Sequence, residues 1–283
     1  MKQYEDNPKS IKYHVKKYIL RHQNRFEQKT VVDLPAGNGI TSKILKDIGA
    51  KPLAFDLFPE YFQIEIVECR RANVMEGIPM DEKTADWVIC QEGIEHFSNQ
   101  FKALTEFNRV LKLNGSLIIT TPNYSSLRSK LSYFLSESER FHSMMPPNEL
   151  DSVWMNNQNI SKEVYFGHVF LLGIHKLRVL ARLAGFKIKE IQFTQLKTTS
   201  LLIFILTYPL IFLSNVYTYF KHIRKNKGYD KAFQKEVYKE LFFLSINPKI
   251  LLDSHLFVEF EKISDFDEVM NQLKSVNREF GTT

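Results

Sequence analysis

The chain has 283 residues, of which 44% are hydrophobic and 25% are charged. This composition is that of a globular protein and excludes a disordered or fibrous one. Two cysteines, Cys69 and Cys90, are too few for a disulfide framework, and both lie in apolar runs, so we expect reduced core thiols in a cytoplasmic protein. The first ten residues are polar, so we expect no secretory signal.

The net charge of +6 is concentrated in two places. Residues 1–29 carry eight Lys or Arg side chains and three acidic ones, and residues 221–239 form a second basic cluster. Localised positive charge favours a phosphate-rich partner, which is either nucleic acid or an anionic membrane surface. A solvated basic surface is the alternative for each cluster.

Apolar residues at helical spacing predict a basic helix over 9–28. Beyond it, short apolar runs alternate with helical stretches. The predicted strands are 30–35, 51–56, one within 64–74, 85–91 and 116–122. One predicted helix ends near Gly49, and a second runs over 99–115 and is closed by Asn114-Gly115. This alternation indicates an α/β fold with a parallel, doubly wound sheet, which binds ligands at the carboxyl ends of its strands.

The second half of the chain is less regular. Residues 123–170 are polar and aromatic, and we interpret them as a lid on the substrate side. A helix over 175–186, strands over 187–195 and 255–262, and a short helix over 265–276 follow. We therefore divide the chain into a basic N-terminal helix (1–29), a core with its lid (30–195), an apolar and basic insert (196–254), and a last strand with a terminal helix (255–283).

The segment VVDLPAGNG, residues 31–39, has an acid at the end of a strand and Gly-x-Gly at the following turn. Glycines allow the backbone to approach a ligand closely, and the next helix offers free N–H groups. A plain turn is the alternative. Asp56 ends the next strand, 17 residues past Gly39, where an acid can hold both hydroxyls of a ribose. Ser42 replaces the third glycine of the dinucleotide motif, so nicotinamide or flavin is less favoured.

These motifs resemble those of the class I S-adenosylmethionine-dependent methyltransferases. The matching segments are DLPAGNG, AFD, RANVMEGIP, ADWVICQEGIEHF, RVLKLNGSLIITTPN and GHVFLLGIHKLRVLARLAGFKI, within residues 28–194, together with residues 255–262. The resemblance implies a Rossmann-like, mostly parallel sheet of seven strands with an antiparallel last strand. The chain departs from the family pattern at Pro35, where Gly is usual, and at Asn73, where Asp is usual.

The resemblance also implies which residues bind S-adenosylmethionine. Asp33, Gly37 and Gly39 would position its methionine part, and Asp56 would hold its ribose. Asn73, Val74 and Gln91 would border the adenine and the sulfonium side. The remaining implied cofactor residues are Pro35, Ala36 and Leu57.

The segment E-x-x-E-H, formed by Glu92, Glu95 and His96, resembles a segment of two methyltransferase groups. These are the ubiquinone-biosynthesis O-methyltransferases and the small-RNA 3′-terminal 2′-O-methyltransferases. The resemblance implies that the three side chains serve the acceptor and bind a divalent metal such as Mg²⁺ or Mn²⁺, with His168 as a candidate fourth ligand. Alternatively His96 is a metal-free general base or a wall of the pocket, and His168 is structural. No role is assigned to the other histidines, His255 among them.

Residues 198–220 contain no charge, and Lys197 and Lys221 flank them. A run of this length can span a bilayer. A single crossing would separate strand 255–262 from the sheet, so we expect the insert to dip and return or to lie in the membrane interface. We expect Pro209 to break a continuous helix there. A buried helical hairpin or a dimer interface is the alternative.

We therefore interpret the chain as an S-adenosylmethionine-dependent O-methyltransferase. The expected acceptor is a lipid-linked or envelope glycan or another amphipathic hydroxyl compound, met at an anionic membrane surface on the inner face of the cell membrane. One alternative is RNA 2′-O-methylation, although nucleic acid is the less favoured partner because the lid lacks a basic, aromatic track. The other is a non-catalytic membrane-bound scaffold with a methyltransferase fold.

Overall fold

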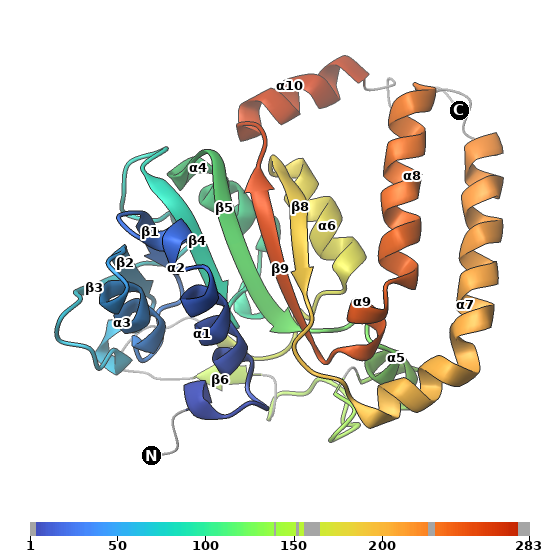
Figure 1. Ribbon diagram of the computed structural model, residues 1–283, viewed down its shortest axis with the longest axis horizontal. Coiled ribbons are helices and arrows are strands. Elements are labelled where there is room, and N and C mark those ends of the chain that lie inside the picture. Colours follow the sequence, from blue (N-terminus) through green and yellow to red (C-terminus); the bar gives the residue numbers. More distant parts are fainter. Residues whose placement is uncertain (1–3, 139, 151–152, 156–164, 226–229, 277–283) are drawn as a thin grey trace.

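The computed structural model describes residues 4–138, 140–150, 153–155, 165–225 and 230–276 (Figure 1). Its centre is a seven-stranded sheet in the order β3-β2-β1-β4-β5-β9-β8. These strands are β1 (Thr30–Asp33), β2 (Lys51–Asp56), β3 (Cys69–Arg71), β4 (Ala85–Gln91), β5 (Leu111–Pro122), β8 (Phe186–Gln192) and β9 (His255–Lys262). The pairs from β3 to β5 are parallel, and β9 runs antiparallel to β5 and β8. The predicted Rossmann-like sheet with an antiparallel last strand is confirmed.

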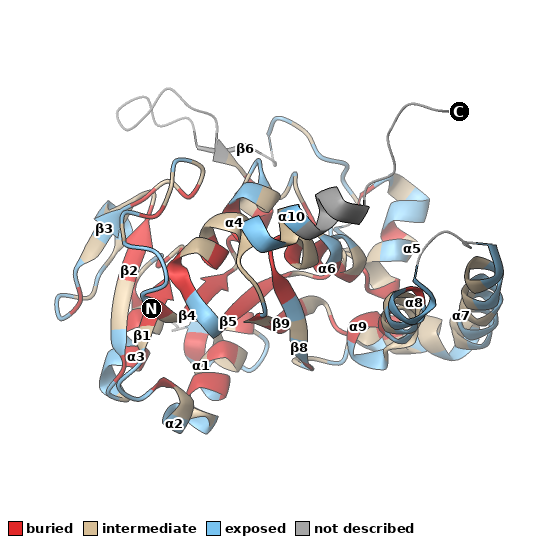
Figure 2. Ribbon diagram, turned by 90° about the horizontal axis from the view of Figure 1, so that it is seen from above, coloured by how far each residue is buried: buried red, intermediate tan, exposed pale blue. Residues whose placement is uncertain are grey.

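Helices cover both faces of this sheet (Figure 2). On one face, α4 (Gln100–Val110) and α6 (Ile174–Leu183) pack against a core cluster that includes Val32 and Val88. On the other face, α1 (Ile11–Arg21) and α3 (Ile40–Asp47) pack against a cluster that includes Val31 and Ile89. Successive strand residues point to opposite faces, so a strand covered on both faces must be apolar throughout. This is why β1 and β4 show as continuous apolar runs in the sequence.

The N-terminal segment forms two helices where one was predicted over 9–28. Ser10 caps α1 by accepting a hydrogen bond from the Lys12 N–H, and the helix turns at His22 into α2 (Gln23–Phe26). A short 3-10 helix, η1 (Tyr4–Asp6), precedes them. The buried Glu259 on β9 accepts hydrogen bonds from the Tyr18 hydroxyl at 2.5 Å and from the Arg25 guanidinium. These bonds join the N-terminal helices to the sheet.

The prediction of a helix over 99–115 was wrong at its end. The helix α4 stops at Val110, and Leu111 already has an extended backbone and begins β5. Ala85 lies opposite Leu111, whereas Trp87 lies opposite Ser116, so the intervening residues bulge out of the strand. Asn114, with a φ of +64°, lies in this bulge. The Asn-Gly pair therefore marks a strand bulge rather than the end of a helix.

The region interpreted as a lid contains α5 (Leu127–Ser136) and a two-stranded sheet of β6 (Val153–Met155) and β7 (Tyr165–Phe166). Residues 156–164 of this region lie outside the described part of the chain. The remaining short elements of the core are η2 (Pro59–Tyr61) and η3 (Ile94–His96), and α10 (Phe266–Val276) follows β9. The lid interpretation remains a prediction.

The apolar insert forms a helical hairpin beside the sheet. Its arms are α7 (Thr198–Lys225) and α8 (Lys231–Ile246), and α9 (Pro248–Leu252) leads back to β9. The prediction that Pro209 would break the helix was wrong, because Pro209 lies inside a continuous α7. Figure 1 shows that α7 is bent, which is the usual response of a helix to an internal proline.

The later turns of α7 lie outermost, with α8 between them and the sheet (Figure 2), whereas its first turns lie against α5 and α9. Among the described helices, α7 is the one long and apolar enough to cross a membrane, and 6% of its apolar window is buried. The alternative of a buried hairpin is therefore wrong for the single chain. Since β9 follows the hairpin and pairs with β5, the chain on both sides of the insert belongs to one sheet.

Candidate functional site

A cavity of about 950 Å³ opens at the carboxyl ends of β1, β2 and β4. It is lined by every predicted cofactor residue except Gly39: Asp33, Pro35, Ala36, Gly37, Asp56, Leu57, Asn73, Val74 and Gln91. The four residues predicted to serve the acceptor or a metal also line it: Glu92, Glu95, His96 and His168. The fold therefore places both predicted groups around one cavity, at the sheet edge where parallel folds bind ligands.

The two glycines of the loop after β1 differ in their surroundings. Gly37 has a φ of +54°, and a Cβ there would meet no atom within 4 Å. Gly39 has a φ of +86°, and a Cβ there would lie 2.6 Å from the Phe62 ring and 2.8 Å from Ile64. Gly37 therefore forms part of the cavity wall, whereas Gly39 allows the loop to pack against the chain and begin α3.

Asp56 and Asp33 hold the loop from its two sides. The Asp56 carboxylate accepts hydrogen bonds of 2.8 Å from the N–H groups of Gly37 and Phe58. Asp33 is buried, accepts a hydrogen bond of 2.6 Å from the Ser42 hydroxyl, and has its pKa raised to about 7 by burial. Ser42, which replaces the third glycine of the dinucleotide motif, thus has a structural role that sequence reasoning missed.

Two amide side chains border the same cavity. Asn73 accepts a hydrogen bond of 3.0 Å from the Met75 N–H and donates one of 3.1 Å to Glu76. Gln91, at the end of β4, accepts a hydrogen bond of 3.0 Å from the Thr41 hydroxyl. The amide oxygen of Asn73 therefore already has one partner, and an amide oxygen has a second lone pair available for a ligand.

The E-x-x-E-H segment turns sharply after β4. Glu92 has a φ of +49°, and its N–H donates a hydrogen bond to the Thr120 carbonyl on β5. The next turn, η3, carries Glu95 and His96. The Glu95 side chain is fully buried, and its carboxylate oxygens make no hydrogen bond of ordinary geometry to the described residues, although the nearby Thr121 hydroxyl partly offsets the effect of burial on its pKa. Burying a carboxylate without hydrogen-bond donors costs free energy, which indicates that this carboxylate binds a positively charged or hydrogen-bonding group.

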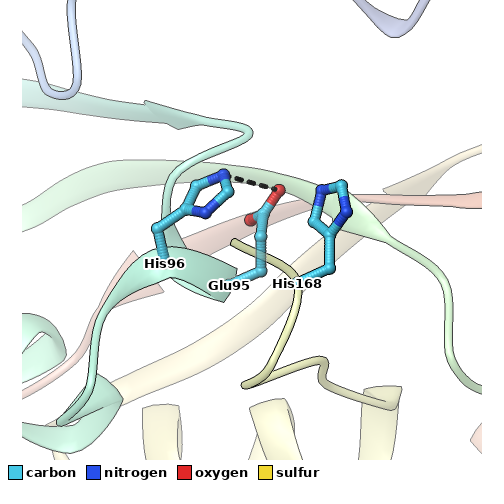
Figure 3. Close-up of side chains that lie close together, drawn as sticks. All are labelled: Glu95, His96 and His168. Carbon is cyan, nitrogen blue, oxygen red and sulfur yellow. Dashed lines mark ion pairs between the residues drawn. The ribbon is translucent and has the colours of Figure 1, made fainter. Parts of the chain in front are cut away.

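Figure 3 shows the Glu95 carboxylate between the imidazoles of His96 and His168. One ligand atom from each of the three residues lies within 4.8 Å of the others. The Nδ1 of His96 lies 3.0 Å from the Phe166 carbonyl and 3.1 Å from the Gly167 carbonyl, so it must carry the proton and donate. The Nε2 of His96, which faces Glu95 at 4.0 Å, is then the unprotonated nitrogen.

The predicted four-residue metal set is only partly assembled. Glu92 does not join the group of Glu95, His96 and His168. Its Oε2 instead lies 3.8 Å from Nε2 of His255, at the start of β9. Sequence reasoning assigned no role to His255, since no local pattern marks it and only the antiparallel placement of β9 beside β5 brings it to this edge.

Burial controls the charges in this cluster. It raises the pKa of both Glu92 and Glu95, and their proximity raises that of Glu92 further. It lowers the pKa of His96, and burial, His96 and Arg140 together lower the pKa of His168 to about 4. Both imidazoles are therefore neutral at pH 7, which is the form that binds a metal ion.

The chain was compared with known proteins. Residues 9–191, more than half of the chain, match the family model described as a methyltransferase domain. The chain belongs to this methyltransferase family. It is a class I S-adenosylmethionine-dependent methyltransferase, as the motifs predicted.

Curated relatives match this methyltransferase over part of their length. An uncharacterised methyltransferase-like protein of Schizosaccharomyces pombe is 32% identical over 97 residues, 32% of this chain and 37% of the relative. The mitochondrial ubiquinone biosynthesis O-methyltransferase of the same yeast is 26% identical over 129 residues, 42% of this chain and 47% of the relative. The chain thus spans less than half of the length of these two relatives.

A solved structure confirms the fold of the methyltransferase over most of its length. The S-adenosylmethionine-dependent methyltransferase of Archaeoglobus fulgidus superposes with a TM-score of 0.52 at 13% sequence identity and covers 92% of this chain and 98% of its own. At that identity the likeness concerns the fold alone. The methyltransferase therefore carries its glycine loop, Asp56 and the cluster of Glu95, His96 and His168 on the expected scaffold.

Proposed function

We propose that the methyltransferase transfers a methyl group from S-adenosylmethionine to a hydroxyl of an amphipathic acceptor, such as a lipid-linked or envelope glycan, at a membrane surface. The observation that carries this proposal is the cluster of the buried Glu95 with the half-buried His96 and His168, in the same cavity as the glycine loop. A cluster of this kind serves to deprotonate and orient a hydroxyl, which is the difficult part of methylating an oxygen. The ubiquinone biosynthesis O-methyltransferase relatives also support oxygen as the acceptor atom.

The reaction balances without an external co-reactant. The acceptor oxygen forms a bond to the methyl carbon as the bond between that carbon and the sulfonium sulfur breaks. The sulfur keeps the electron pair and leaves as S-adenosylhomocysteine. The hydroxyl proton passes to a base of the cluster, for which the unprotonated Nε2 of His96 is the candidate.

The cluster fits a divalent metal such as Mg²⁺ or Mn²⁺. Glu95 would supply a carboxylate oxygen that makes no hydrogen bond of ordinary geometry to the described residues, and His96 and His168 would supply neutral imidazole nitrogens. A bound ion would make an adjacent hydroxyl more acidic. Glu92 and His255 would then stand beside this group rather than within it.

The test uses metal binding and methyl transfer together. We expect Mn²⁺ to raise the melting temperature of the wild-type protein and to leave that of Glu95→Gln unchanged, because ligand binding stabilises only a folded state that holds the ion. We expect Glu95→Gln and a chelator each to reduce methyl transfer by about 100-fold or more. The control is Glu65→Gln, which changes an exposed carboxylate outside the cavity. Full transfer by a folded Glu95→Gln protein would contradict the proposed role of the cluster.

The membrane part of the proposal rests on α7. Six of its large exposed apolar side chains recur every three or four residues and form a stripe along the helix, which the exposed Ile205 and Phe212 widen. The six are Leu202, Leu206, Leu210, Leu213, Tyr217 and Phe220. Leu206 and Leu213 are 78% and 62% exposed. An exposed apolar stripe of this length marks a surface that binds something apolar.

Charge favours an anionic bilayer as the occupant of this stripe. The last turns of α7 carry Lys221, Arg224 and Lys225, and α7 contains no carboxylate. Cations at the end of an apolar helix suit anionic headgroups. The first turns of α7 lie at the edge of the molecule to which the carboxyl ends of β4 and β5 point (Figure 1). Docking there would bring an acceptor held in the membrane close to the site.

Vesicle flotation tests this docking. We expect the wild-type protein to float with vesicles of phosphatidylglycerol and phosphatidylcholine, and the double variant Leu206→Glu/Leu213→Glu to stay in solution. The control is Leu113→Glu, which adds a charge at a 58% exposed leucine in the β5 bulge. Flotation of the double variant would overturn the docking. A wild-type dimer that the same double substitution dissociates would assign the stripe to a second copy of the chain instead.

A further inference from the structure

A second cavity of about 320 Å³ adjoins the candidate site. Its walls are the end of β5 with the first turn of α5, the segment 140–143, and Lys197, the residue before α7. His168 lines both this cavity and the larger one. A ligand group held here would therefore lie beside the cluster that faces the acceptor hydroxyl.

The second cavity is basic. Arg128, Arg140, His142 and Lys197 line it, and no carboxylate is among its described lining residues. Within the described chain, Arg128, Arg140 and Lys197 form no ion pair. Five other described arginines each pair with a glutamate, whereas Arg21, Arg70 and Arg224 also form no ion pair within the described chain. The five are Arg25, Arg71, Arg109, Arg178 and Arg182. The charge of Asp253 offsets part of that of Lys197, and the guanidinium groups of Arg128 and Arg140 have no carboxylate partner among the described residues.

Burial makes this arrangement costly without a ligand. The Nε of Arg128 is buried and has no hydrogen-bond partner among the described residues. Its guanidinium lies 4.5 Å from the centre of the Phe141 ring, which fixes its plane. Burial and the charge of Arg128 lower the pKa of Lys197. Arg128 and Lys197 are half-buried and Arg140 is exposed, so an anion bound here would meet cations that are partly shielded from water. The cavity therefore suits a negatively charged group.

From this geometry we infer that the second cavity binds a phosphate or diphosphate group of the methyl acceptor. The two guanidinium groups and the ammonium group carry more positive charge than a single carboxylate can neutralise. A phosphate monoester, with a charge of about −1.5 to −2 at pH 7, matches them better. Guanidinium groups match phosphate oxygens with paired hydrogen bonds. This inference rests on the proposed function, since His168 links the anion to the methyl-transfer site.

The position of Lys197 relates this site to the membrane surface. Lys197 lines the cavity, and α7 begins at the next residue. A phosphate at this position can belong to a lipid headgroup or lipid carrier, or to a soluble phosphorylated acceptor. The chemistry that the protein recognises is the same in both cases, and the two sources are separable by experiment.

Calorimetric titration with inorganic diphosphate tests the site directly. We expect the wild-type protein to bind diphosphate, and Arg128→Gln/Arg140→Gln to bind it about ten-fold or more weakly, because two charge-assisted contacts are lost. If the double variant does not fold, the single variant Arg140→Gln, which changes an exposed side chain, is titrated with diphosphate in its place. The control is Arg182→Gln, which lies on α6 outside both cavities. Equal binding by wild type and the arginine variants, or no binding by wild type, would overturn the inference.

Two further arms identify the source and separate this inference from the proposed function. Vesicles containing phosphatidic acid that bind the wild-type protein more strongly than the double variant would indicate a lipid phosphate; equal vesicle binding, with the diphosphate difference retained, would indicate a soluble acceptor. S-adenosylmethionine should bind all variants equally. If the arginine variants transfer methyl groups with an unchanged KM for the acceptor, the phosphate site is overturned and the proposed function is left intact. Diphosphate binding without methyl transfer would overturn the proposed function while leaving the phosphate site intact.

Discussion

Glu95 is the residue on which the proposed chemistry of the site depends most. Its carboxylate is fully buried, lies between two imidazoles, and makes no hydrogen bond of ordinary geometry to the described residues. The protein therefore accepts a loss of stability at this position, since a buried carboxylate favours its protonated form. Such a cost is expected where a side chain must meet an ion or a substrate.

This cost predicts a pH dependence for metal-free protein. The pKa of Glu95 is raised in the folded state above its ordinary value of 4.5, so the folded state holds the proton to higher pH than the unfolded state. The contribution of Glu95 to stability is therefore largest below pH 4.5 and falls as the pH rises through the raised pKa. We expect Glu95→Gln to be more stable than wild type at pH 8 by on the order of 2 kcal/mol, and to show little difference at pH 4. Urea unfolding in the presence of a chelator measures this, and a difference that does not grow with pH would contradict it.

The two loop glycines give a matched pair of substitutions. Gly39→Ala combines an unfavourable φ with a clash against Phe62, so we expect it to lower the free energy of unfolding by about 3 kcal/mol. Gly37→Ala meets no neighbour and should cost about 1 kcal/mol, while its methyl group enters the cavity and weakens S-adenosylmethionine binding. Thermal unfolding and ligand titration measure the two effects. Equal stability losses would show that the contact with Phe62 is not what requires Gly39.

The sequence alone located most of the cavity because its residues follow strands that could be recognised. Asp33, Asp56 and Gln91 end β1, β2 and β4, and parallel strands bring their carboxyl ends to one edge. His255 could not be found in this way, because its approach to Glu92 depends on a strand that follows after a long insertion. The separation of Glu92 from the other three residues depends on the positive φ at Glu92, which the sequence pattern does not encode.

At the scale of elements, the central strands β1 and β4 were predictable because they are apolar on both faces, whereas the ends of helices were not. Asn-Gly is compatible both with a helix end and with a strand bulge, since each requires a positive φ at one residue. Because Leu111 already has an extended backbone, the helix has ended before the Asn-Gly pair, which therefore forms the bulge. Pro209 was similarly ambiguous, because an exposed helix can bend and continue past a proline.

The attachment of α1 to the sheet gives an element-scale prediction. Tyr18 donates a hydrogen bond to the buried Glu259, so Tyr18→Phe should lower the free energy of unfolding by roughly 1–3 kcal/mol. Tyr13→Phe is the control, because it removes a hydroxyl of the same helix for which the described residues provide no hydrogen-bond partner, and should change stability by less than about 0.5 kcal/mol. Denaturant titration compares the two, and equal losses would show that Glu259 does not anchor α1.

At the scale of the whole molecule, three features meet at one edge of the sheet. They are the cofactor cavity, the basic second cavity and the beginning of α7. The shared residue His168 joins the two cavities, and Lys197 joins the second cavity to α7. This arrangement suits an acceptor whose hydroxyl enters the methyl-transfer site while its phosphate and apolar part stay at a membrane surface.

The most direct test follows the methyl group itself. Membranes and extract from cells that contain the acceptor are incubated with the protein and S-adenosylmethionine labelled in its methyl group, and the label is separated into lipid, glycan, RNA and protein. We predict alkali-stable label in the lipid or glycan fraction with the wild-type protein and its loss with Glu95→Gln. Label confined to ribonuclease-sensitive material, or no label in any fraction with a folded protein that binds S-adenosylmethionine, would contradict methylation of an amphipathic hydroxyl acceptor.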